Sequence, residues 1–522
     1  MEKTAEKIEE KPAESKHGID MTCGSILPKI LRFAAPLALS GILQLAFNAA
    51  DVVVLGRFVG ADALAAVGST GSLVNLLINF FIALSVGVNV TVSTNYAAKR
   101  YNDVSRAVNT AVTIALAAGV FLIFAGVLLC KPMLTAMGSP EDILPMSVTY
   151  LRIYFCAMPF VLLYNFGSAI LRSIGDTRRP FFFLLIAGVV NVCLNLFFVI
   201  VLGMGVAGVA IATDISNMIS AVLVLIVLIR EDSCLKLTKL GFDPRAVRMI
   251  ARVGVPAGIQ SVLFNVSNVI IQSSVNSFGA ATMAANAAAA NLEGFYSTAY
   301  SSVTDSVVTF ISQNNGAKKY SRLNRIIWST LICAFIICAI CSAIYTLFGR
   351  QLLSIYTTDP QVAEIGMRRL YVFICTYFLA AILNTMSGAI RGLGNGIFPM
   401  ITVLVGAVGF RFFWIFVVFA RYHDYQLLLW GYPISWAITS LVLIAGYIHE
   451  RHKLPAEDAP EEPDPQGIMM NDAPAYDILQ SQGRSPLTDL KRPGMSRKEQ
   501  GGHVNVRRKE NRSNRRGERR SP

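Results

Sequence analysis

The sequence predicts an all-α membrane protein with about twelve transmembrane helices in two homologous six-helix bundles. Three observations support this. The 522 residues are 54% hydrophobic and only 15% charged, with a mean hydropathy of +0.52, whereas soluble domains carry about 25% charged residues. About twelve apolar runs each reach the roughly 20 residues that a helix needs to cross a bilayer. The two halves of the apolar region also repeat one another.

The apolar runs divide the chain into two lobes and three polar segments. The predicted spans are 29–56, 67–93, 105–130, 147–171, 179–202, 206–229, 253–278, 284–311, 325–347, 369–390, 397–420 and 428–449. The chain therefore separates into a polar N-terminal segment (1–24), an N-lobe (25–229), a linker (230–252), a C-lobe (253–450) and a tail (451–522). The tail is rich in Pro, Gly, Asn and charge without apolar periodicity, so we expect it to be disordered.

The first span carries three residues that are unusual in hydrocarbon, namely Pro36, Asn48 and Asp51. An ionised carboxylate in a bilayer costs about 3 kcal/mol or more, so an intramembrane Asp is a candidate functional residue. Pro36 removes one helical hydrogen bond and predicts a kink in this helix. The structural alternative is that Asp51 only hydrogen-bonds a neighbouring helix.

Every second connection between the predicted spans is rich in Lys and Arg. These connections include Lys99–Arg100, Arg178–Arg179, Lys318–Lys319 and the long linker 230–252. By the positive-inside rule, these connections and both termini face the cytoplasm. We therefore expect a multi-pass protein of the cell (inner) membrane with cytoplasmic termini.

The two halves of the chain are a duplication. The segment LRSIGDTRRP at 171–180 reappears as IRGLGNGIFP at 390–399, so Arg391 takes the place of Arg172 in the second copy. Pro36 and Pro256 match at nearly the same offset. Two units of six spans joined through the cytoplasm have the same orientation, so their pseudo-two-fold axis runs along the membrane normal. Transporters of this design bind substrate between their halves and alternate access by rocking them.

The sequence lacks the motifs that are typical of several functional classes. The pattern GxxxxGK[ST] is absent, which argues against an ATP-driven pump. The nine cysteines and five histidines are scattered, without a CxxC pair or metal-ligand spacing. We therefore expect no enzymatic activity, no cofactor and no transition-metal site.

Three motifs resemble those of the multidrug and toxic compound extrusion (MATE) family, bacterial type. They are FNAADVVVLGRFVGADALAAVG at 47–68, the paired turns at 171–180 and 390–399, and QNNGAKK at 313–319. The resemblance runs through both halves, over about residues 25–450. It implies a secondary antiporter that exports small organic, often cationic, compounds in exchange for Na⁺ or H⁺ by alternating access.

The resemblance also implies a coupling-ion site in the N-lobe. Asp51 matches the family's acid, Asn191 and Asn195 match two polar positions four residues apart on one helical face, and Thr213 matches a threonine. Some relatives carry Asp at the position of Asn195, so this chain has one negative charge fewer there. Four oxygen-bearing side chains from three helices can hold a Na⁺ ion or a proton.

Two carboxylates on the eighth predicted span, Glu293 and Asp305, are candidate substrate ligands together with Arg411. In the functional interpretation, Glu293 or Asp305 faces the central cavity and attracts a cationic drug. In the structural alternative, one of them pairs with Arg411 and holds the eleventh span in place. Six aromatic residues can line a drug cavity or, more commonly, pack helices together: Phe47, Tyr164, Phe295, Tyr296, Phe412 and Trp414.

Two alternative functions stay open from the sequence. A flippase for a lipid-linked saccharide of the same broader superfamily predicts a strongly basic central cavity for pyrophosphate. A non-transporting membrane anchor leaves the intramembrane carboxylates unexplained. The expected partners are small organic substrates and membrane lipids, with no specific nucleic acid, and the protein is expected to be a monomer. The basic end of the tail, 491–522, suits anionic headgroups or RNA, and a solvated tail without a partner fits equally.

Overall fold

The computed structural model describes residues 18–137, 140–231, 233–357, 359–456 and 458. These residues belong to one compact unit, which is helical without a strand in its described part. The expected tail, 451–522, and the N-terminal segment, 1–24, lie mostly outside the described residues. Residues 18–24 are the described end of that segment, and Met21 there is fully buried against α9, where its carbonyl oxygen accepts from Asn314 at 3.1 Å.

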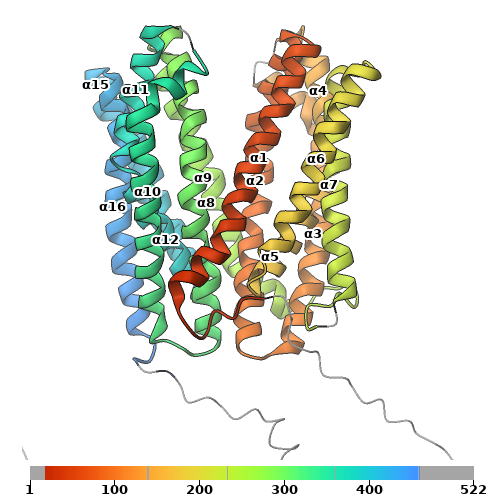
Figure 1. Ribbon diagram of the computed structural model, residues 1–522, viewed down its shortest axis with the longest axis vertical. Coiled ribbons are helices and arrows are strands. Elements are labelled where there is room, and N and C mark those ends of the chain that lie inside the picture. The colour runs from red at the N-terminus through yellow and green to blue at the C-terminus, as the bar shows by residue number, and fades with distance from the viewer. Residues whose placement is uncertain (1–17, 138–139, 232, 358, 457, 459–522) are drawn as a thin grey trace, which may run out of the picture. The chain divides into compact units, whose positions relative to one another are not determined.

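Each lobe consists of six consecutive spans (Figure 1). The N-lobe contains α1 (Ile26–Phe58), α2 (Ala61–Ala97), α3 (Tyr101–Ala136), the pair α4 (Leu144–Cys156) and α5 (Met158–Ser173), α6 (Arg178–Leu196) with its π-helical end η1 (Phe197–Val201), and α7 (Gly205–Arg230). The C-lobe contains α8 (Pro244–Asn276), α9 (Ala280–Gly316), α10 (Arg322–Ser354), the pair α11 (Pro360–Ile374) and α12 (Tyr377–Gly392), a span with π-helical turns, and α16 (Tyr425–His452). That interrupted span comprises α13 (Ile397–Val403), η2 (Leu404–Gly409), α14 (Phe410–Phe413), η3 (Trp414–Phe419) and α15 (Ala420–Tyr422).

The expected number of spans agrees with the structure apart from one polar helix. Among the described residues, nine helices are long and apolar enough to cross a membrane, and two further pairs qualify when each pair is one bent span. The twelfth segment is α9, which has 37 residues like its repeat mate α2 but is less apolar. It carries Glu293, Asp305 and many Ser and Thr side chains, because one of its faces lines the cavity described below.

Both repeats contain a bent span at the equivalent place. The angle between α4 and α5 is 47°, and the angle between α11 and α12 is 46°. The predicted start of the second bent span, residue 369, is wrong, because α11 begins at Pro360. The prediction failed because residues 360–369 include charged side chains such as Glu364, which lie exposed on the outer face of an amphipathic helix.

The linker is shorter than expected because α8 begins at Pro244, well before the predicted start of the span at residue 253. The carboxylate of Asp243 caps this helix by accepting from the backbone N–H groups of Arg245 and Ala246, both at 2.9 Å. The hydrogen bond from Ala246 holds the pKa of the Asp243 carboxyl below its usual value. This cap allows α8 to extend beyond the bilayer at its N-terminal end.

The repeat-related helices α1 and α8 each pack against both lobes. Phe33, near the start of α1, contacts Phe310 of α9 edge to face, with 5.9 Å between ring centroids. Leu55, near the end of α1, belongs to an N-lobe cluster with Val209 of α7. The helix α8 mirrors this arrangement, with Ile250 in the N-lobe core and Ile271 and Val275 in a C-lobe cluster. In Figure 1, α1 accordingly crosses obliquely from one bundle to the other.

The helices α2 and α8 lie close enough that glycine is required between them. A Cβ atom on Gly87 of α2 would lie 2.1 Å from the carbonyl oxygen of Ile250 on α8. Gly254 of α8 faces the same crossing, where its Cβ would approach the carbonyl oxygen of Leu84 to 2.6 Å. Because both approaches are to backbone atoms, this crossing joins the lobes without intervening side chains.

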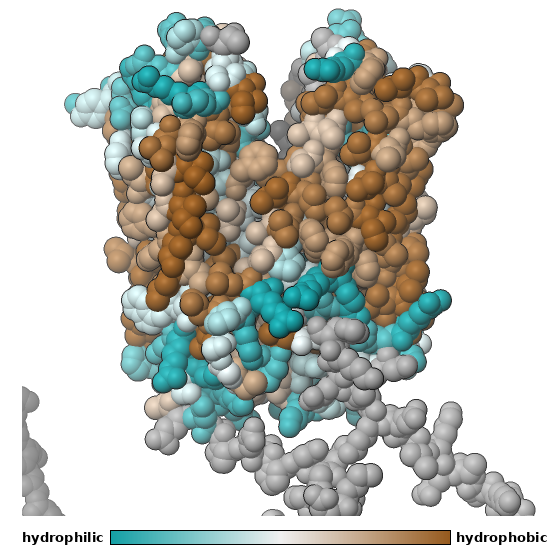
Figure 2. All heavy atoms as spheres, viewed as in Figure 1, coloured by the Kyte–Doolittle hydropathy of each residue, from teal (hydrophilic) through white to brown (hydrophobic). Residues whose placement is uncertain are grey.

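The outer surface of the lobes is apolar along its middle, and polar side chains collect at both ends (Figure 2). Exposed side chains of α3 illustrate the apolar face: Phe121 and Phe124 are each 63% exposed and Leu128 is 71% exposed. The end that carries the turns after α2 and α9 is called the closed end here, because the lobes contact each other there. At the opposite end Figure 2 shows a hollow between the lobes.

Candidate functional site

Four side chains from three helices form one hydrogen-bonded chain in the N-lobe, called the N-lobe polar site here. Asn195 of α6 donates its side-chain amide to Oδ1 of Asp51 on α1. The same amide lies 3.3 Å from Oδ1 of Asn191, whose own amide donates to Oγ1 of Thr213 on α7, also at 3.3 Å. The structure thus brings together all four residues that the family resemblance assigned to one site.

The N-lobe polar site offers oxygen atoms that suit a small hard cation. Asn195 is fully buried, and its side-chain Oδ1 has no hydrogen-bond partner. The second carboxylate oxygen of Asp51 and Oγ1 of Thr213 belong to the same group of side chains. Among the described residues no group of three or more His, Cys, Asp or Glu side chains could hold a metal ion, so the donor set is one of amide, hydroxyl and single carboxylate oxygens.

Three further side chains surround this site, and sequence reasoning did not assign them to it. Asp214 adjoins Thr213, and its buried Oδ1 has no hydrogen-bond partner. Tyr150 and Tyr154 of α4 stack on each other with 5.9 Å between ring centroids. Both phenols lie within electrostatic range of Asp51 and Asp214. Asp214 projects from a different face of α7 than Thr213, so its spacing in the sequence did not indicate that it lies near the site. In the fold, Tyr150 and Tyr154 of α4 lie near both Asp51 and Asp214.

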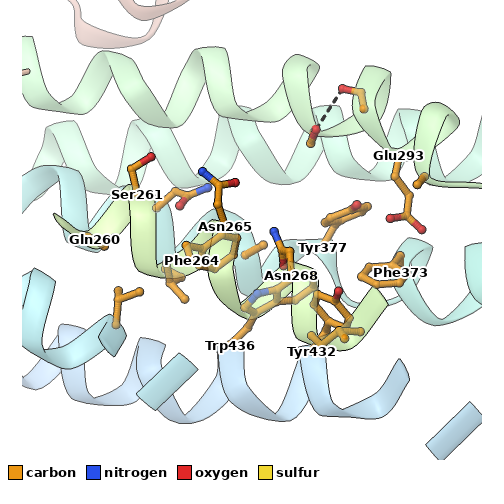
Figure 3. Close-up of a pocket in the computed structure, with 18 of the residues that line it drawn as sticks. Gln260, Ser261, Phe264, Asn265, Asn268, Glu293, Phe373, Tyr377, Tyr432 and Trp436 are labelled. Atoms are coloured by element: carbon orange, nitrogen blue, oxygen red, sulfur yellow. Dashed lines mark hydrogen bonds between the residues drawn. The ribbon is translucent and has the colours of Figure 1, made fainter. Parts of the chain in front are cut away.

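The C-lobe encloses a cavity of about 840 Å³. Its wall comes mainly from α8, α9, α11, α12 and α16, whereas α2 of the N-lobe contributes only Asn79 and Ala83. The expected cavity between the two halves therefore lies largely on the C-lobe side. Figure 3 shows polar side chains of α8, Asn265 and Asn268, beside the aromatic side chains of Tyr377, Tyr432 and Trp436.

Glu293 lines this cavity and is paired with an arginine that the sequence did not indicate. Arg369 of α11 donates from Nε to Oε1 of Glu293 and from Nη2 to Oε2, both at 2.7 Å. Nη1 of Arg369 donates to Asn286, whose amide donates to Oε1 of Gln272 at 2.8 Å. The alternative in which Arg411 is the partner of Glu293 is therefore wrong.

Arg411 is 1% exposed and lies behind the cavity wall. Its guanidinium carbon lies 4.7 Å from the ring centroid of Phe264 and 4.3 Å from that of Tyr432. Its hydrogen bonds, to Ser435 and Asn268, are both long at 3.4 Å, and Nη2 has no partner. Arg411 makes no ion pair in the part of the chain that the structure describes.

Asp305 also lines the cavity, where its side chain is exposed. Its charged neighbours are Arg172 and Arg391, the two arginines that occupy matching positions in the repeats. Arg172 donates from Nε to the carbonyl oxygen of Ser168 at 3.2 Å. Arg391 donates from Nη2 to Oε1 of Gln260 at 2.6 Å. The acid thus lies in the field of one arginine from each lobe.

The aromatic residues of the cavity are not those that the sequence suggested. The cavity is lined by Phe264, Tyr300, Phe373, Tyr377, Tyr432 and Trp436. None of Phe47, Tyr164, Phe295, Tyr296, Phe412 and Trp414 is among the lining residues. Tyr296, for example, is buried in the C-lobe core, where its hydroxyl donates to the carbonyl oxygen of Cys338 at 2.9 Å. Aromatic residues in membrane helices more commonly pack helices together, which is why the residues suggested by the sequence do not line the cavity.

The family model MatE matches residues 36–197 and again residues 256–417. The chain belongs to the MatE family. The two matches begin at Pro36 and Pro256, the prolines that correspond in the repeat, so they coincide with the duplication. MatE proteins are multidrug efflux transporters with several membrane spans, and this chain shares that architecture in both halves.

Two curated bacterial relatives and one solved structure illustrate the similarity. The probable multidrug resistance protein YoeA of Bacillus subtilis is 30% identical over 428 residues, which cover 80% of this chain and 92% of the relative. The probable multidrug resistance protein NorM of Thermotoga maritima is 27% identical over 391 residues, which cover 73% of this chain and 83% of the relative. A crystal structure of MATE in the bent conformation aligns with a TM-score of 0.77 at 19% identity, and the alignment covers 84% of this chain and 98% of that chain. This last likeness concerns the fold alone.

Proposed function

We propose that this MatE protein is a secondary antiporter that exports small organic compounds in exchange for Na⁺ or H⁺ by alternating access. The observation that carries the proposal is the separation of two sites. The N-lobe polar site around Asp51 offers a few oxygen atoms, which suit an ion, whereas the C-lobe cavity of about 840 Å³ suits an organic molecule. An ion at one site and a substrate at the other can each bias the packing of the lobes.

The proposed orientation places the closed end in the cytoplasm of a bacterial cell membrane. The turns after α2 and α9 at this end carry Lys99, Arg100, Lys318 and Lys319. The positive-inside rule favours basic loops on the cytoplasmic side, so both termini lie there and the hollow opens outward. The apolar outer faces of the helices then contact membrane lipids, and a monomer contains both sites.

The C-lobe cavity gives little support to a lipid-linked saccharide flippase. Its volume of about 840 Å³ lies within the range of about 300–1,000 Å³ that is typical of small-molecule sites. The two arginines that line it, Arg369 and Arg391, have the acids Glu293 and Asp305 as neighbours, so the cavity is not strongly basic. A non-transporting anchor would have no use for either site.

A vesicle experiment tests the proposal. The full-length protein is reconstituted in liposomes of defined orientation, and accumulation of a fluorescent substrate is followed under an imposed Na⁺ gradient, an imposed pH gradient or neither. We expect accumulation under at least one gradient and its collapse when an ionophore dissipates that gradient. Equal substrate movement with and without both gradients would contradict the proposal.

A further inference from the structure

The charged side chains around the C-lobe cavity limit the kinds of ligand that it can attract. Two acids, Glu293 and Asp305, and two arginines, Arg369 and Arg391, line the wall. Both carboxylate oxygens of Glu293 accept hydrogen bonds from Arg369 at 2.7 Å. Such a bidentate pair is among the strongest that side chains form, and a cationic ligand would have to displace the arginine to reach this carboxylate.

The aromatic faces that could bind a cation are also partly occupied. Arg411 lies over the rings of Phe264 and Tyr432, at 4.7 and 4.3 Å from their centroids. Arg369 lies 4.8 Å from the ring centroid of Phe373. A ring face that already carries a guanidinium group has little quadrupole attraction left for a second cation. Tyr377 and Trp436 stack on each other with 5.7 Å between their centroids, and both line the cavity.

Arg411 adds a positive charge that no acid in the described part of the chain compensates. It is 1% exposed, its two hydrogen bonds are 3.4 Å long, and Nη2 has no partner. Arg391 also has an unpartnered buried nitrogen, Nε. A buried charge without a counterion is costly, so an anion that reaches the wall near Arg411 gains the missing interaction.

Asn268 connects this charge to the ligand space. Its Oδ1 accepts the hydrogen bond from Nη1 of Arg411, and the residue lines the cavity, where Figure 3 shows it beside Trp436. Its amide nitrogen remains as a donor, as do the amides of Asn265 and Gln260 along α8. This row of donors suits a carboxylate or sulfonate, whose oxygens only accept hydrogen bonds.

We propose that the C-lobe cavity prefers flat aromatic compounds that carry a single anionic group. The aromatic part packs against Tyr377 and Trp436, and the anionic group accepts from Asn268 in the field of Arg411. A pyrophosphate, with more than one negative charge, would also meet the repulsion of Glu293 and Asp305. The proposal names the substrate class of the exporter proposed above, and it rests on that function only for the transport of the ligand.

Binding to the purified full-length protein in detergent tests the preference directly. Three probes share one scaffold and differ in charge: 2-naphthoate, 2-naphthamide and 2-naphthyltrimethylammonium, each titrated by calorimetry. We expect naphthoate to bind about tenfold more tightly than the ammonium compound, a difference of about 1.4 kcal/mol. Tighter binding of the ammonium compound, equal binding of all three or binding of none would each overturn the proposal.

Two variants connect the preference with Arg411. Arg411→Gln should remove the advantage of naphthoate over naphthamide. Because this residue is buried and its replacement can impair folding, Asn268→Asp provides an independent test with a change in the wall itself. Asn268→Asp should weaken the binding of naphthoate and tighten the binding of the ammonium compound. Asn268→Leu removes the same amide without adding charge, so it should not tighten the binding of the ammonium compound. Unchanged selectivity in Asn268→Asp would overturn the assignment.

Transport measurements separate this proposal from the proposed function. Binding of naphthoate without gradient-driven transport of any probe would refute antiport and leave the binding preference standing. Gradient-driven transport with tighter binding of the ammonium compound would refute the preference and leave antiport standing.

Discussion

Asn89 of α2 hydrogen-bonds to Thr309 of α9, the residue next to its own repeat mate, Val308. The amide of Asn89 donates to Oγ1 of Thr309 at 2.9 Å across a sequence separation of 220 residues. Because repeat-related helices contact each other here at nearly equivalent positions, the pseudo-two-fold axis passes close to the crossing of α2 and α9. Nearby, Ser93 of α2 and Gln313 of α9 both donate to the carbonyl oxygen of Ser173, at 3.1 and 2.7 Å.

The first prediction uses the tight approach of α9 to α2 at the closed end. A Cβ atom on Gly316 would lie 2.2 Å from the carbonyl oxygen of Thr94. Gly316→Ala should therefore move the two helices apart, because a backbone atom cannot yield as a flexible side chain does. We expect a longer distance between spin labels in the turns after α2 and α9, and slower export. Gly68→Ala on α2 meets no atom within 4 Å and should change neither measurement.

The second prediction concerns the pair of Glu293 and Arg369, whose side chains are 11% and 8% exposed. Glu293→Gln or Arg369→Gln alone leaves one buried charge without its partner and should lower stability by about 3–5 kcal/mol. The double variant should recover much of this loss, because neither charge remains. Thermal unfolding in one detergent measures both effects. The exposed pair Glu364 and Arg368, 2.9 Å apart on the same helix, is the matched control, and Glu364→Gln should change stability little.

The third prediction concerns Asp305, which lies between one arginine of each lobe. Asp305→Asn leaves Arg172 and Arg391 as like charges without the acid that is their neighbour. We expect the lobes to separate at the closed end, as a longer spin-label distance between the turns after α2 and α9. Asp305→Glu keeps the charge and should preserve the wild-type distance. An unchanged distance in Asp305→Asn would show that this acid does not hold the lobes together.

The spans and the unusual acid Asp51 could be predicted because their signals are local. The duplication follows from matching segments in the two halves, and the resemblance to the MATE family groups Asp51 with Asn191, Asn195 and Thr213. A membrane helix is a continuous apolar run, and Asn191 and Asn195 share a helical face through their spacing alone. Asp51 stands out because a carboxylate is rare in such a run. Each span, with the unusual residues in it, is therefore determined within about 20 residues of sequence.

The C-lobe cavity could not be predicted in the same way, because its decisive contacts are long-range. Arg369 stands beside Arg368 in a polar run that resembles a loop, yet Arg368 is exposed and Arg369 points inward from α11. It meets Glu293, 76 residues earlier in the sequence, because the span bends by 46° after α11. The amphipathic pattern of residues 360–374 was the one available signal for this inward face.

The last prediction concerns the coupling role of Asp51, whose Oδ1 accepts from Asn195. Asp51→Asn keeps the size of the side chain and removes its charge, so the site can no longer respond to Na⁺ or H⁺. We expect this variant to fold and to bind substrate in the C-lobe cavity but to lose gradient-driven export, because an ion that binds both access states equally cannot bias them. Restoring an acid in the double variant Asp51→Asn with Asn195→Asp should recover part of the export. Asp142→Asn, in an exposed connection, is the control and should export normally. Export by Asp51→Asn at the wild-type rate under both gradients would make Asp51 structural and direct the search for the coupling group to Asp214, the neighbouring acid with a buried oxygen that lacks a partner.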